Sequence, residues 1–121
     1  MALQEILLPA ERDAAPEKIS AWIEGANKRT DEFYSAGLGL RYPKYIQSDP
    51  LLFYTSVAFL KSEDHLLGDV FCEWGCGFGI ATGIASLMGM NAFGIEIEDE
   101  LFDRATRLLN DFNLPAEILN I

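Results

Sequence analysis

The chain has 121 residues, half of them hydrophobic, which suits one domain with an ordinary core and excludes a disordered chain. Nineteen Asp and Glu against nine Lys and Arg give a net charge of −10, and no basic stripe is present, which disfavours a nucleic-acid binder. There is neither a signal-peptide pattern nor a run of eighteen apolar residues, so we expect a soluble, cytoplasmic protein that does not bind membranes.

The N-terminal part of the sequence predicts helix. Residues 1–14 carry a short apolar patch ended by Pro9, which predicts one or two helical turns at most. Pro16 suits the first position of a longer helix, and an amphipathic pattern then predicts a helix over about 16–35 that Gly37 ends. Its apolar side chains are Ile19, Trp22, Ile23, Ala26, Phe33 and Tyr34. An irregular connector follows.

A second helix is predicted after this connector. Asp49 is a good N-cap residue and Pro50 a good first helical residue, and the apolar sequence that follows extends to about Ser62. Because this helix is apolar almost all round, we expect it to be buried on more than one side.

The rest of the chain alternates between strand and helix patterns. The expected segments are a buried central strand at 70–74, a helix at 80–90, a strand at 92–97, a helix from Glu98 or Asp99, and a strand at 116–121. Such a β-α-β-α-β order predicts a parallel sheet with right-handed crossovers, here a Rossmann-like, three-layer αβα fold. Any ligand would then bind at the carboxyl ends of the strands.

A glycine-rich turn follows the first strand. The sequence from Glu73 to Gly79 is E-W-G-C-G-F-G, which allows a tight turn and lets a ligand approach the main chain. The N-terminal N–H groups of the next helix point to the same place. Glu96 ends the second strand, where a carboxylate suits the two hydroxyls of a ribose. We therefore predict a nucleoside-containing ligand; the alternative is a turn packed for tightness, with Glu96 merely solvated.

The details of the turn select among nucleosides. A dinucleotide fingerprint needs glycine where Ile80 stands, and a phosphate-binding Walker loop needs a lysine that this turn lacks. Glu73 just before the turn would repel phosphate and suits a cationic or amino group. A nicotinamide or flavin enzyme is therefore a weaker alternative. No metal site is expected from Cys72, Cys76 and the single histidine.

The segment E-x-G-x-G-x-G, with G-I-E some twenty residues later, resembles the class I, seven-β-strand, S-adenosylmethionine-dependent methyltransferases. The resemblance implies that the turn lies against the adenosine and methionine parts of this cofactor. It also implies that the acid after the second strand holds the ribose. The residues that it assigns to cofactor binding are Glu73, Gly75, Cys76, Gly77, Gly79, Glu96 and, against the adenine, Ile97.

The resemblance extends upstream. Tyr45-Ile-Gln-Ser48-Asp-Pro50 and the apolar helix after it are similar to the lead-in of groups that include several protein lysine methyltransferases, although Gln47 stands where proline is usual. By this similarity Tyr45 and Ser48 close over the cofactor; the alternative is ordinary packing and helix capping. The resemblance covers 45–121, the expected cofactor-binding part, and leaves 1–44 as an N-terminal helical segment.

The resemblance implies a methyltransferase that acts on protein lysine or another nucleophile, with catalytic residues unknown. About three of the seven strands are present, so the alternative is a non-catalytic S-adenosylmethionine-binding or assembly module. The acidic surface favours a protein acceptor over nucleic acid. In the family the first strand is central and pairs with the second and the fourth strands. With no fourth strand here, its apolar outer edge is expected to be open, and the chain is expected to form a homo-oligomer through this edge.

Overall fold

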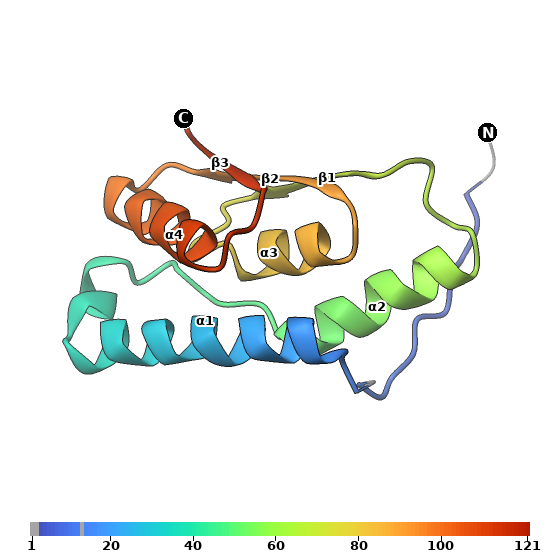
Figure 1. Cartoon of the computed structure of the whole chain (residues 1–121), viewed down its shortest axis with the longest axis horizontal. Coiled ribbons are helices and arrows are strands. Elements are labelled where there is room, and N and C mark those ends of the chain that lie inside the picture. The colour runs from blue at the N-terminus through green and yellow to red at the C-terminus, as the bar shows by residue number, and fades with distance from the viewer. Residues whose placement is uncertain (1–2, 13) are drawn as a thin grey trace.

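A computed structural model describes residues 3–12 and 14–121 and shows a parallel sheet with helices packed against it (Figure 1). The elements in chain order are α1 (Glu17–Ser35), the 3-10 helix η1 (Leu38–Arg41), α2 (Pro50–Ser62), β1 (Val70–Trp74), α3 (Ile80–Leu87), β2 (Asn91–Glu96), α4 (Asp99–Asp111) and β3 (Glu117–Asn120). The strands are parallel in the order β1-β2-β3. The predicted β-α-β-α-β order and Rossmann-like fold are thus confirmed, with end points that shift by up to three residues.

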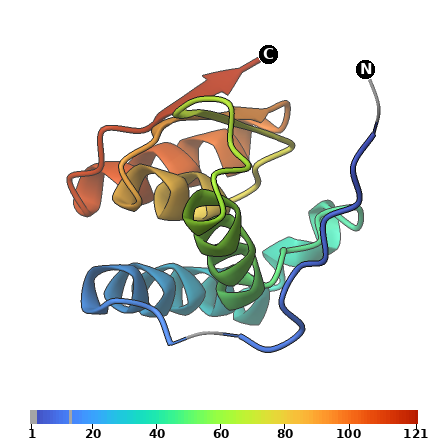
Figure 2. The same cartoon turned by 90° about the vertical axis from the view of Figure 1, so that its right-hand side faces the viewer.

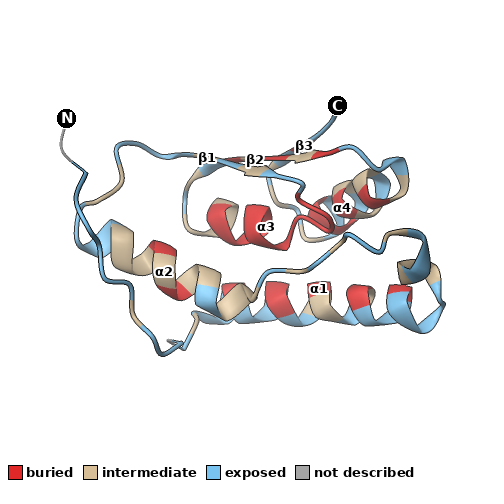
Figure 3. Ribbon diagram, turned by 180° about the vertical axis from the view of Figure 1, so that it is seen from behind, coloured by how far each residue is buried: buried red, intermediate tan, exposed pale blue. Residues whose placement is uncertain are grey.

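The elements are stacked in layers that start at the sheet. In Figure 1, α3 and α4 lie against one face of the sheet, and α1 and α2 lie beyond them. On this inner face, alternate residues of β2 are buried, as is Ile118 of β3. Figure 3 shows the buried positions concentrated between α1, α3, α4 and the sheet. The core therefore fills the space on one side of the sheet.

Helix α1 packs along α3 through its apolar stripe. Trp22 is fully buried, and its indole N–H donates to the carbonyl of Ile80 at 2.9 Å. Gly83 of α3 lies so close to this indole that a Cβ there would be 2.1 Å from Cζ2 of Trp22. Phe33 lies edge-on to Phe78 at a centroid distance of 5.4 Å. The predicted amphipathic helix is confirmed, and its small-residue partner α3 explains the close approach.

The N-terminal apolar patch does not form the predicted helical turns. Residues 3–12 contain no helix, and Leu3 and Leu7 are exposed. Arg12 instead forms an ion pair with Asp49, the N-cap of α2. The expectation failed because the patch is too short to nucleate a helix without a packing partner. The irregular connector after α1 also contains η1, which the sequence period did not reveal.

Helix α2 begins as predicted but is less buried than expected. Asp49 accepts a hydrogen bond from the N–H of Leu52 at 2.9 Å, and Pro50 is the first helical residue. Only Thr55 and Val57 are buried in this helix, so burial on more than one side is wrong. Figure 2 shows α2 rising between α1 and the sheet, and its remaining residues are half-buried or exposed.

Strand β1 is an edge strand and is not buried. Val70 and Trp74 are 64% and 83% exposed, because β1 pairs with β2 on one side and nothing in residues 3–12 and 14–121 pairs with its other side. The sheet face away from α3 carries mostly apolar side chains, and we call it the open face. Its apolar residues are Val70, Cys72, Trp74, Phe93, Ile95 and Leu119, and its polar residues are Asn91 and Glu117. No helix in the described part of the chain is long and apolar enough to span a membrane.

Candidate functional site

The turn between β1 and α3 is held in a conformation that requires glycine. Gly75, Gly77 and Gly79 have φ values of 67°, 56° and 73°, in the left-handed region. The N–H of Cys76 donates to the carbonyl of Ile95 at 2.9 Å, which fastens the turn to β2. The alternating glycines of the sequence thus serve a tight connection between two neighbouring strands and a helix.

Glu96 fastens the same turn from the end of β2. Its side chain is 5% exposed; Oε1 accepts from the N–H of Gly77 and Oε2 from the N–H of Glu98, both at 2.9 Å. The alternative of a merely solvated Glu96 is therefore wrong. Each carboxylate oxygen has a further lone pair, so Glu96 can still accept a hydrogen bond from a ligand hydroxyl.

Glu73, the last inward-facing residue of β1, caps helix α3. Its Oε1 accepts from the hydroxyl of Thr82 at 2.9 Å and from the N–H of Thr82 at 3.2 Å. Burial raises the pKa of Glu73, the hydrogen bonds from Thr82 lower it, and the charge of Glu96 raises it. Both hydrogen bonds from Thr82 end on Oε1, which leaves Oε2 able to accept from a cationic or amino group. Sequence reasoning missed Thr82, although its place in the first turn of α3 is where capping partners occur.

The ring of Tyr45, from the connector before α2, covers the glycine-rich turn at Gly77. A Cβ at Gly77 would lie 2.3 Å from Cε1 of Tyr45, so only glycine leaves room for this ring. The ring stacks on Tyr34 at a centroid distance of 6.4 Å and lies 5.9 Å from the ring of Phe78. Burial raises the pKa of the Tyr45 hydroxyl, which therefore stays protonated at neutral pH. The connector before α2 is thus packed as a wall above the glycines.

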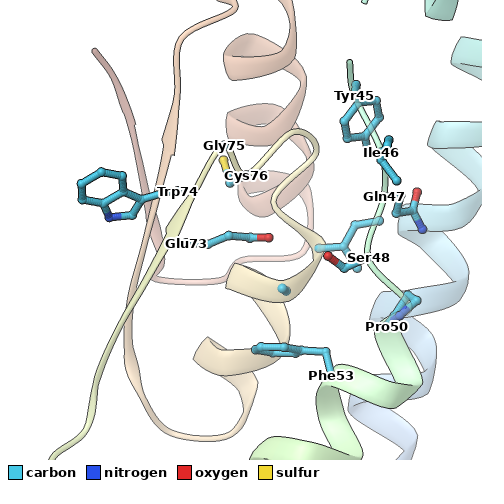
Figure 4. A pocket seen from close by; sticks show the side chains of 12 residues that line it. Tyr45, Ile46, Gln47, Ser48, Pro50, Phe53, Glu73, Trp74, Gly75 and Cys76 are labelled. Atoms are coloured by element: carbon cyan, nitrogen blue, oxygen red, sulfur yellow. The ribbon is translucent and has the colours of Figure 1, made fainter. Parts of the chain in front are cut away.

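A first cavity of about 240 Å³ lies between this wall and the end of β1. Figure 4 shows Glu73 and Ser48 pointing toward one another across it, and Trp74 pointing away toward the open face. Phe53 of α2 lies at one end. The lining residues are Tyr45, Ile46, Gln47, Ser48, Pro50, Phe53, Glu73, Trp74, Gly75, Cys76, Ile80 and Ala81.

A second cavity of about 550 Å³ lies over the end of β2. It shares Tyr45, Ile46 and Gly75 with the first cavity, so the two cavities are neighbours at the carboxyl ends of β1 and β2, and we refer to them together as the groove. Glu96 and Ile97, which the sequence assigns to cofactor binding, line the second cavity. Sequence reasoning did not name the other lining residues, which are Ile46 of both cavities, Gln47, Pro50, Phe53, Trp74, Ile80 and Ala81 of the first, and Arg41, Tyr42, Pro43, Lys44, Glu98 and Leu101 of the second.

The groove brings together most of the predicted residues, while Gly77 and Gly79 lie beneath it. Gly77 is covered by Tyr45, and a Cβ at Gly79 would lie 3.4 Å from Ile118. Cys76 is 5% exposed, and burial raises the pKa of its thiol to about 12, so it lines the groove as a neutral group. At Gly75 nothing lies within 4 Å of where a Cβ would be, so the main chain is open to a ligand there.

No protein-family profile and no curated protein matches this sequence. Among solved structures, a similar fold is found in an S-adenosylmethionine-dependent methyltransferase from Clostridium acetobutylicum (TM-score 0.56, 15% identity, 76% of this chain and 36% of that chain). Magnesium protoporphyrin IX methyltransferase from Synechocystis PCC 6803, with bound S-adenosylhomocysteine, is also similar (TM-score 0.52, 19% identity, 75% and 48%).

The present chain spans less than half of the length of these two structures. Their likeness confirms the Rossmann-like fold that the resemblance to class I methyltransferases implies.

Proposed function

We propose that this chain is the cofactor-binding part of an S-adenosylmethionine-dependent methyltransferase. The observation that carries the proposal is the pair of neighbouring cavities over the carboxyl ends of β1 and β2, with Glu73 in one and Glu96 in the other. A ligand with a cationic amino-acid end and a nucleoside end matches this distribution of carboxylates. A dinucleotide fits it less well, because its pyrophosphate would cross the turn between the two carboxylates.

The second cavity fits the nucleoside end. Glu96 keeps lone pairs for the ribose hydroxyls, and the exposed Ile97 and the buried Leu101 supply apolar surface for the adenine. The first cavity fits the amino-acid end, where Oε2 of Glu73 can accept from the ammonium group and Ser48 faces it. None of the residues that line the first cavity is Lys or Arg, which suits a cationic ligand.

When bound, the cofactor would supply an electrophilic methyl group. The residues of this chain would bind and orient it, and the Tyr45 wall would exclude water from one side. No catalytic residue is assigned, because the acceptor side of the groove is not defined by the described residues. For the acceptor we propose a protein lysine in preference to a nucleic acid, since the net charge of −10 attracts lysine-rich segments.

Calorimetry with S-adenosylmethionine, S-adenosylhomocysteine and NAD tests this function. We expect both sulfur-containing ligands to bind and NAD not to bind. Glu96→Gln should weaken binding at least tenfold, about 1.4 kcal/mol, because one acceptor oxygen becomes a donor. Glu117→Gln, a matched change at an exposed position of β3, should leave binding unchanged. Thermal unfolding of both variants shows whether the fold is retained.

Absence of binding by both sulfur-containing ligands at millimolar concentration would refute the proposal, as would tighter binding of NAD. Binding by the chain without methyl transfer to any lysine-rich protein would favour the alternative, a non-catalytic S-adenosylmethionine-binding module.

A further inference from the structure

Residues 38–44, which form η1 and the turn after it, make one side of the second cavity. That side is lined by Arg41, Tyr42, Pro43 and Lys44, and the other by Glu96, Ile97, Glu98 and Leu101. None of residues 38–44 is buried. Backbone hydrogen bonds within the connector run from the N–H of Tyr42 to the carbonyl of Gly39 and from the N–H of Tyr45 to that of Tyr42. Burial of apolar surface therefore contributes little to holding this side in place.

Side-chain hydrogen bonds fasten this segment to α4 through one carboxylate. The hydroxyl of Tyr42 donates to Oε2 of Glu100 at 2.9 Å, and Nη1 of Arg41 donates to the same oxygen at 3.3 Å. Oε1 of Glu100 accepts from Nη2 of Arg104 at 3.4 Å. Glu100 lies in the first turn of α4, two residues after Glu98 of the cavity. Glu100 thus joins the two sides of the second cavity, although it lines neither cavity.

A second set of contacts connects Tyr42 with Glu100 through α1. The ring of Tyr42 stacks on that of Phe33 at a centroid distance of 6.2 Å, and the guanidinium of Arg104 lies 5.0 Å from the Phe33 centroid. Arg104 in turn pairs with Glu100. Four side chains from the connector, α1 and α4 therefore form a closed ring of contacts. Because Phe33 is buried, packing fixes the face of the Tyr42 ring, and the bond to Glu100 fixes its hydroxyl end.

We propose that Glu100 is a positioning residue: by holding the hydroxyl of Tyr42, it keeps residues 38–44 in place as one side of the second cavity. Where it concerns the ligand, this rests on the proposed function, which assigns the nucleoside end of S-adenosylmethionine to that cavity. A hydrogen bond from a hydroxyl to a carboxylate is charge-assisted and stronger than one between neutral groups. The bond lowers the pKa of Glu100 and raises the pKa of Tyr42, so both groups keep the protonation that the bond needs at neutral pH.

The ion pairs of Glu100 are secondary to this bond. The side chain of Arg41 is 63% exposed, and ion pairs between exposed side chains contribute little to stability and are screened by salt. A neutral side chain that keeps an acceptor oxygen should therefore replace Glu100 with little loss, whereas a side chain without oxygen should not. This difference separates the hydrogen bond from the charge.

Hydrogen–deuterium exchange of the ligand-free chain tests whether Glu100 holds the segment. Glu100→Ala and Tyr42→Phe should each speed exchange within 38–46 about fivefold, since one hydrogen bond contributes a factor of that order. The double variant should be little faster than Glu100→Ala, because both changes remove the same bond. Glu100→Gln should exchange like wild type. Exchange in α3 and β2 should be unchanged in every variant, whereas a general loss of stability would speed it throughout.

Asp99→Ala is the matched control. It removes the neighbouring carboxylate from the first turn of α4, where both acids interact with the helix dipole, but Asp99 is exposed. Exchange within 38–46 should therefore stay like wild type in this variant. Equal exchange of this segment in wild type and Glu100→Ala would overturn the proposal.

Calorimetry with S-adenosylhomocysteine tests the consequence for the ligand. Glu100→Ala should weaken binding by up to about fivefold, because the apparent dissociation constant rises as fewer chains have the segment in place. Glu100→Gln and Asp99→Ala should bind like wild type. Faster exchange in Glu100→Ala without weaker binding would also overturn the proposal. If the wild-type chain does not bind, the proposed function fails and the ligand role of Glu100 with it, whereas the exchange data still decide whether Glu100 holds the segment.

Discussion

At the residue scale, the two carboxylates of the groove have structural tasks that limit what they can do for a ligand. Glu96 holds the N–H groups of Gly77 and Glu98, and Glu73 holds the first turn of α3 through Thr82. Both are fixed in place before any ligand arrives, which lowers the entropy lost on binding. The same bonds mean that a change at either residue alters the turn as well as the groove.

The raised pKa of Glu73 predicts that replacing its carboxylate by a neutral side chain increases the stability of the fold, by an amount that depends on pH. Its pKa is higher in the folded chain than in the unfolded chain, so at pH above the ordinary value of 4.5 the folded chain holds more protons than the unfolded chain does. Stability is therefore lost with rising pH through this window and is unaffected below it. Glu73→Gln keeps an oxygen for Thr82 and removes the charge, so the variant should gain stability relative to wild type at pH 7, with little gain at pH 4.

Urea unfolding at the two pH values measures this difference. Glu117→Gln provides the control, because its side chain is exposed and its effect should be small at both pH values. An equal change for Glu73→Gln at pH 4 and pH 7 would show that the carboxylate is not penalised by burial.

The sequence predicted which residues gather at the groove but not how they are bonded. The positions of Glu73 and Glu96 follow from strand ends and from the glycine pattern, which are local features, whereas Tyr45 was named only through the family resemblance. Thr82 as the partner of Glu73, and the N–H of Gly77 as the partner of Glu96, depend on side-chain directions that no spacing in the sequence encodes.

At the element scale, the one glycine within α3, Gly83, is explained by the approach of α1. Glycine within a helix is about 1 kcal/mol less favourable than alanine, so a helix with several small residues needs a compensating contact. The contact is the indole of Trp22, which is fully buried against Gly83 and anchored to the carbonyl of Ile80. A buried ring held by a hydrogen bond cannot move aside for an added methyl group.

Gly83→Ala should therefore destabilise the fold in spite of its better helix propensity. The added Cβ would lie 2.1 Å from Trp22, and such overpacking costs about 1–3 kcal/mol net in well-packed cores. Gly25→Ala in α1 is the matched change: its Cβ would meet the tip of Phe112 at 2.3 Å, but this half-buried ring can swing away. Chemical unfolding should rank Gly83→Ala as the more destabilising; the reverse order would contradict the assigned packing.

Two elements were predicted correctly in type and wrongly in burial, for a shared reason. The apolar sequences of α2 and β1 indicate that these elements can be covered, and the structure leaves both partly exposed. The hydrophobic pattern shows which sides of an element can be buried. Whether another element packs against such a side depends on the rest of the fold. Bounds and types were predictable because caps, glycines and alternation act within a few residues.

At the scale of the whole molecule, the hydrophobic core extends across the boundary between 1–44 and 45–121 that the sequence motifs suggest. The sequence resemblance covers 45–121, and this division of the chain stays a prediction. In the structure, one hydrophobic cluster joins side chains of α1 with those of the turn, α3 and α4. Trp22 and Phe33 of α1 are among its fully buried members. Helix α1 therefore supplies part of the core on which the groove-forming turn rests.

Removal of residues 1–44 should prevent the remaining chain from folding. The truncation deletes Trp22 and Phe33, and loss of one buried aromatic side chain alone typically costs about 3–5 kcal/mol. Loss of both, with the other buried residues of α1, exceeds the roughly 5–15 kcal/mol by which a domain is stable. A chain that starts at Ala15 is the control, because the described residues that it loses include no buried side chain, and the ion pair that it loses, from Arg12, is at the surface. Circular dichroism should show cooperative thermal unfolding for the control and none for 45–121; a cooperative transition in 45–121 would show that the groove is supported without α1.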